Sequence, residues 1–183
     1  IFGIDEQDLI DEEGNGLGTS ATLGNTSNLG LAGDANKIAY ITPKMGGFQA
    51  GYSIMDSGTA VQSTDQTAMG FSYTMPMAGG SLMIRYNKQS TDGTAAAETE
   101  ASNYGVKLTV GALTAIASTG TSTIGTGSSQ SDDRNASGIG IKYDMGGGMT
   151  IAATTMKAED DKDVSGTQNE EYSANLAEVV YTV

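Results

Sequence analysis

Residues 103–110 read NYGVKLTV, and every second side chain in this stretch is apolar. In an extended chain Tyr104, Val106 and Leu108 point to one side, whereas Lys107 points to the other. Residues 80–88, GSLMIRYNK, repeat the pattern around a central arginine. A period of two is typical of a β-strand that has one apolar face and one polar or small face.

The same alternation recurs along most of the chain after residue 36. We expect nine strands, at about 37–43, 47–55, 67–75, 80–88, 103–110, 113–119, 137–144, 149–157 and 172–183. The last of these loses its alternation at Ala177–Glu178, which predicts a β-bulge at that point.

The connections between these strands alternate between short and long. The short ones carry the Gly or Pro that tight turns need. The long ones, at 56–66, 89–102, 120–136 and 158–171, are rich in Ser, Thr, Gly and Asp. Of the 22 acidic residues, all except Asp144 and Glu178 lie in these loops or in the opening 36 residues. The pattern predicts an all-β fold, a transmembrane antiparallel up-and-down β-barrel.

Composition agrees with a barrel wall and excludes several other classes of protein. The chain has a net charge of −13 and no Cys, His or Trp. Absence of Cys and His removes disulfide scaffolds, imidazole bases and most zinc sites, and the acidity argues against nucleic acid as a partner. So few apolar residues would leave a soluble domain without a core, but a wide barrel needs none. We therefore expect no enzyme and no cofactor.

Strand parity also predicts which side chains meet the membrane. We expect these to point outward, to lipid or a neighbouring subunit: Phe48, Tyr52, Phe71, Tyr73, Leu82, Ile84, Val106, Leu108, Ile139 and Ile141. We expect these to point into the lumen: Gln49, Ser72, Arg85, Lys107 and Lys142. A cation facing lipid at mid-membrane costs about 2–4 kcal/mol, which assigns the three basic residues to the pore wall.

At residues 37–55, KIAYITPKMGGFQAGYSIM, the chain resembles the general porins of the Gram-negative outer membrane. The resemblance rests on Tyr40, Thr42-Pro43, Gly47-Phe48 and Gly51-Tyr52-Ser53, which match an aromatic-bearing strand, a Ser/Thr-Pro turn and the returning strand of such a hairpin. It implies a trimeric, sixteen-stranded barrel of which 1–183 forms one segment, with strands six to fourteen in 37–183.

The resemblance also implies a role for residues 1–36, which precede that hairpin. In such porins this place belongs to the loop that folds into the barrel and narrows the channel. The expected constriction residues are Asp5, Glu6, Asp8, Asp11, Glu12 and Glu13. The alternative is an exposed acidic tail.

The sequence departs from the family in its odd strand count, its missing first five strands and its missing closing strand with a terminal aromatic. We therefore expect a segment of a longer protein or an incompletely known sequence.

The function expected from these patterns is passive diffusion of small hydrophilic solutes and ions across the outer membrane, with a mild preference for cations. The expected partners are outer-membrane lipid and two further copies of the chain. The rival hypothesis is a secreted acidic β-solenoid, an adhesin or a surface-layer protein, which would show a fixed repeat length. A barrel enzyme would need a base for its nucleophile, and the chain has no His.

Overall fold

A computed structural model of the chain describes residues 36–56, 64–93, 98–126, 130–162 and 170–181. These residues form nine β-strands joined by turns. The strands are β1 (Asn36–Ile41), β2 (Phe48–Asp56), β3 (Thr64–Met77), β4 (Gly80–Gly93), β5 (Glu98–Val110), β6 (Leu113–Thr126), β7 (Gln130–Gly146), β8 (Met149–Lys162) and β9 (Glu170–Tyr181).

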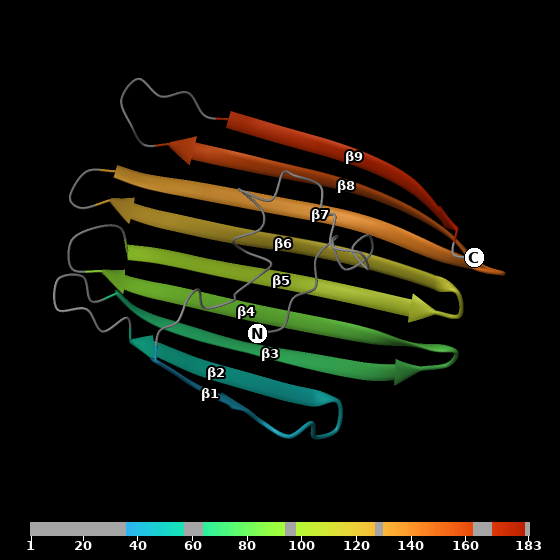
Figure 1. Ribbon diagram of the computed structural model, residues 1–183, viewed down its shortest axis with the longest axis horizontal. Helices are drawn as coiled ribbons and strands as arrows, with labels where there is room; N and C mark the ends of the chain where they lie inside the picture. Colours follow the sequence, from blue (N-terminus) through green and yellow to red (C-terminus); the bar gives the residue numbers. More distant parts are fainter. Residues whose placement is uncertain (1–35, 57–63, 94–97, 127–129, 163–169, 182–183) are drawn as a thin grey trace.

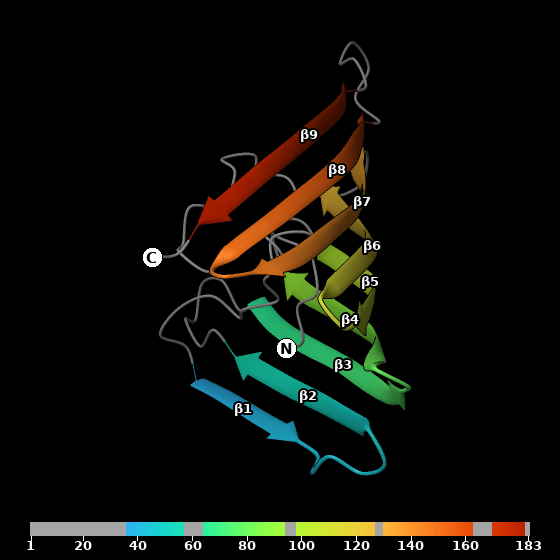
Figure 2. The ribbon, with the colours of Figure 1, turned by 90° about the vertical axis from the view of Figure 1, so that its right-hand side faces the viewer.

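All nine strands belong to one antiparallel sheet whose spatial order follows the chain (Figure 1). This up-and-down meander confirms the predicted all-β architecture, and its hairpins differ from the stacked repeats of a solenoid. Viewed from the side, the sheet is bent into a trough, with β4–β7 at the back and β1 and β9 at the two rims (Figure 2). The sheet therefore has a convex face and a concave face, called here the outer and inner faces.

The turns after β1, β3, β5 and β7 lie together at one end of the sheet (Figure 1). Backbone hydrogen bonds tie these turns to their neighbours. The Thr74 amide of β3 donates to the Gly47 carbonyl of the first turn at 2.9 Å, and the Gly111 amide donates to the Gly79 carbonyl of the adjacent turn at 2.9 Å. Gly47 has a φ of 88°, which favours glycine, and a Cβ there would overlap the Thr74 carbonyl oxygen. This end of the sheet is consequently compact and tightly connected.

Several strands extend beyond their predicted ends at the opposite end of the sheet. β4 continues to Gly93, β6 continues to Thr126 and β7 begins at Gln130. These extensions were predicted as loops because their residues are polar on both faces, so the apolar alternation that marks a strand disappears. β1, in contrast, ends at Ile41, before Pro43, which lacks the amide that a ladder needs.

The predicted bulge at Ala177–Glu178 is wrong. The pairing of β8 with β9 runs without interruption from Met149↔Tyr181 to Asp160↔Glu170. The register shift lies instead between Asp144 and Gly146 of β7, where the Gly146 amide donates to the Asp144 Oδ1 at 2.8 Å. The alternation was misread because the apolar residues Ala174 and Leu176 share the inner face with Glu178, whereas Val179 and Tyr181 face outward.

No helix in the described part of the chain is long and apolar enough to cross a membrane.

Candidate channel wall

The outer face of the sheet carries large apolar side chains that remain exposed. Eight of the ten residues predicted to point outward have exposed fractions between 39% and 59%: Phe48, Tyr52, Phe71, Tyr73, Ile84, Val106, Ile139 and Ile141. The other two, Leu82 and Leu108, are direct partners across β4 and β5 on the same face and are half-buried. A soluble sheet would bury such a face.

The inner face carries polar and small residues together with two larger buried apolar side chains, Ile116 and Met156. Its buried polar side chains are Ser53, Ser72, Asn87, Asn103 and Thr154. Asn87 pairs with Gly70, and a Cβ at Gly70 would overlap the Asn87 Oδ1, so glycine there makes room for the amide. An exposed apolar face combined with a polar inner face is the arrangement of a membrane barrel, with lipid outside and water inside.

Aromatic rings cross the outer face of four strands in an unbroken series. The ring centroids of Phe48 and Phe71 are 6.2 Å apart, those of Phe71 and Tyr86 are 5.7 Å apart, and those of Tyr86 and Tyr104 are 4.7 Å apart. Cross-strand aromatic pairs of this kind stabilise a sheet and suit the interfacial zone of a bilayer. The series thus links β2 to β5 on the side that faces outward.

The apolar residues of the outer face form a band that crosses the strands diagonally. In β2 the band runs from Phe48 to Ile54 and is centred at Gly51. In β9 the apolar residues of the outer face run from Ala177 to Tyr181, the last residue that the structure describes, and are centred at Val179. When directly paired residues are followed from each strand to the next, Gly51 of β2 leads to Tyr172 of β9. Tyr172 lies seven residues before Val179.

This displacement gives the tilt of the strands relative to the band. Seven residues correspond to about 23 Å along a strand, and the seven steps from β2 to β9 correspond to about 34 Å across the sheet. The resulting angle is about 35°, at the lower end of the range for strands in membrane barrels. A level band of lipid contact thus explains why the apolar stretch occupies different rows in different strands.

Register places the three predicted wall cations on the inner face. Arg85 pairs with Ser72, Lys107 pairs with Ile116 and Lys142 pairs with Ala152. Those three partners are 8%, 4% and 5% exposed, whereas the cations themselves are half-buried. The Arg85 Nε also donates a hydrogen bond to the Met83 Sδ at 3.2 Å, on the same face.

The three cations share one height on the wall. The apolar band is centred at Ile84 in β4, at Lys107 in β5 and at Ile141 in β7, so each cation lies within one residue of the centre of its own strand's band. The structure therefore gathers them into an arc halfway through the apolar band.

Ion pairs on the outer face mark where the band ends. Lys88 pairs with Glu100, just beyond the Tyr86–Tyr104 contact, and the Lys157 Nζ lies 3.5 Å from the Glu171 Oε1. All four side chains are a third or more exposed, so the pairs contribute little stability, but they place the aqueous boundary on the long-loop side of the band.

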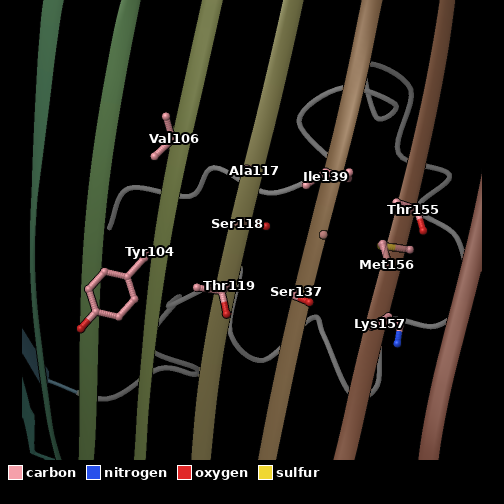
Figure 3. Close-up of a pocket in the computed structure, with 11 residues that line it drawn as sticks. Tyr104, Val106, Ala117, Ser118, Thr119, Ser137, Ile139, Thr155, Met156 and Lys157 are labelled. Carbon is pink, nitrogen blue, oxygen red and sulfur yellow. The ribbon is translucent and has the colours of Figure 1, made fainter.

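A shallow hollow lies on the outer face beside this boundary (Figure 3). Tyr104 and Val106 stand on one side of it and Lys157 on the other, with Thr119 and Ser137 between them. The small side chains of β6 and β7 create the hollow.

The six acids predicted to form a constriction all lie outside the described residues, as does almost all of the segment 1–36. Sequence reasoning also missed an inner-face acid, Glu178, which pairs with the buried Ala152. Its face follows only from the uninterrupted pairing of β9 with β8, because apolar residues occupy both faces of that strand. Among the described residues, no group of three or more His, Cys, Asp or Glu could hold a metal ion.

Comparison with known proteins gives one match. The family model for the Gram-negative porin matches residues 3–177 of the chain. No curated protein and no solved structure matches it.

Proposed function

The chain belongs to the Gram-negative porin family, and on that premise we propose that it forms a passive, mildly cation-preferring diffusion channel for small hydrophilic solutes and ions. Proteins of this family are channels of the outer membrane rather than enzymes. The proposal rests on the two faces of the sheet. The exposed outer face is apolar, whereas the inner face bears polar side chains and cations. The rival solenoid has no comparable explanation for two faces of this kind.

The proposal includes a barrel of sixteen strands, with β1–β9 as strands six to fourteen, and an assembly of three copies. In it, residues 1–36 fold into the lumen, and Asp5, Glu6, Asp8, Asp11, Glu12 and Glu13 face the basic arc of Arg85, Lys107 and Lys142. Selectivity then follows from pore width and from the field between acidic loop and basic wall. The net charge of −13 supports a preference for cations.

The test is conductance in planar lipid bilayers, with reversal potentials measured across a salt gradient. Discrete conductance steps and a reversal potential of the sign for cations are expected, larger at low salt because a Debye length of about 8 Å at physiological salt lengthens on dilution. Replacing the six acids together by Asn or Gln should move the permeability ratio toward anions. An unchanged ratio would mean that residues 1–13 are not the constriction, and absence of conductance would exclude a channel.

The trimer is tested separately, by chemical cross-linking of the protein in detergent. Cross-linked species of two and three chains, with none larger, are expected. A species of one chain at every cross-linker concentration contradicts the assembly without affecting the channel.

A further inference from the structure

We propose that Glu178 is a selectivity-determining residue of the pore. It lies at the same depth, halfway through the apolar band, as the basic arc of Arg85, Lys107 and Lys142. The inference rests on the proposed channel function and adds to it a residue on the wall itself, distinct from the acids of the opening segment.

The face of Glu178 follows from its pairing. It lies directly opposite Ala152 of β8, which is 5% exposed on the inner face, while the next pair, Ala153↔Ala177, belongs to the outer face. Its strand neighbour Val179 is 64% exposed on the outer side. Because the register of β8 and β9 is continuous, the carboxylate of Glu178 shares the inner face with Lys142, which is the other partner of Ala152.

The height of Glu178 matches that of the cations. The described apolar residues of β9 are centred at Val179, one residue from Glu178. The displacement of about one residue per strand from β2 to β7 places the middle of the band in β9 at the same residue. Arg85 and Lys142 are likewise one residue from their band centres, and Lys107 is at its own. Because the band is level in the membrane although the strands are tilted, these four charges lie at a common depth.

Around this level the sign of the charge changes. Among the described residues the level is positive at β4, β5 and β7 and negative at β9, and Ala152 lies between Lys142 and Glu178 in the register. Two strand spacings, about 10 Å, separate the backbones of those two residues, a distance over which physiological salt screens incompletely. The wall therefore carries a field directed along its circumference, which draws anions toward β4–β5 and cations toward β9.

The sign of the effect on permeation follows directly. Removing the carboxylate charge makes the wall at this level more positive, so anions gain and cations lose. A unit charge about 10 Å from a permeating ion, in water, changes the local ion concentration about two-fold at low salt. The change should decline as salt is raised, because the Debye length falls to about 3 Å at 1 M.

The experiment compares reversal potentials of the wild-type channel with those of Glu178→Gln, Glu178→Asp and Glu171→Gln. Glu178→Gln should shift the cation-to-anion ratio about four-fold toward anions at low salt, because the two-fold changes for cations and for anions act in opposite directions. Glu178→Asp keeps the charge and should keep the wild-type ratio, which separates loss of charge from loss of packing. Glu171→Gln is the matched control, since it removes the same charge from the same strand on the outer face, where Glu171 pairs with Lys157.

The outcomes are distinguishable from failure of the channel proposal. If the wild type conducts and Glu178→Gln changes the ratio no more than Glu171→Gln does, Glu178 does not determine selectivity although the protein is a channel. If Glu178→Asp shifts the ratio as far as Glu178→Gln, the effect is structural and the inference is wrong. If no variant, the wild type included, conducts, the proposed function itself fails.

Discussion

Val106→Lys tests the assignment of faces most directly. Val106 is 41% exposed on the outer face and lies one residue, about 3 Å, from the centre of the apolar band in β5. At that depth a lysine exposed to lipid costs about 2–4 kcal/mol. The equilibrium constant for folding into a bilayer should therefore fall roughly 30-fold to several hundred-fold. Thr109→Lys is the matched control, because Thr109 lies three residues along the same strand, half-buried on the inner face.

The assay is folding from urea into lipid vesicles, followed by the gel mobility of the folded form and by its resistance to protease. Val106→Lys should shift the urea midpoint strongly, whereas Thr109→Lys should remain close to the wild type apart from mild repulsion by Lys107. A destabilised Thr109→Lys beside an unaffected Val106→Lys would mean that the faces are reversed. Equal stability of all three proteins would refute the claim that Val106 meets lipid.

Two further predictions concern the ends of the strands. Protease added to intact cells should cut in the connections between β2 and β3, β4 and β5, β6 and β7, and β8 and β9, and should spare Lys44, since the long connections are expected outside and the short turns inside. Cleavage at Lys44 alone would reverse the topology. Gly80→Ala should lower the urea midpoint of folding more than Gly79→Ala does. A Cβ at Gly80 overlaps the Thr109 carbonyl oxygen, whereas Gly79 faces open space and an alanine there bears only the strain of a φ of 78°. Equal midpoints would contradict that packing.

Much of this wall could be predicted from the sequence because the alternation of apolar and polar residues is visible within each strand by itself. Alternation across 103–110 identifies a strand, its two faces and the inner-face position of Lys107 without any information from the neighbouring strands. The glycines of the turns likewise mark where each hairpin reverses. These are local features, and a single sequence contains them.

The rest required the pairing between strands. The strand extensions past Lys88 and Thr119 are polar on both faces, so hydrogen bonds to the adjacent strand, and not apolar alternation, define them. The common height of Arg85, Lys107 and Lys142 could not be predicted from the sequence either, because it follows only from the register across the sheet. Glu178 was missed for the related reason that its face depends on uninterrupted pairing with β8.

The diagonal course of the apolar band also determines how much of a barrel's perimeter each strand occupies. A strand tilted by about 35° with a spacing of about 4.8 Å occupies about 5.9 Å of a barrel's perimeter. The nine strands of the sheet thus account for about 53 Å of wall. At the same stagger, sixteen strands enclose a perimeter of about 94 Å and hence a backbone radius of about 15 Å. A barrel of that radius is too wide for wall side chains alone to occlude, so whatever narrows the passage has to come from a segment inside it.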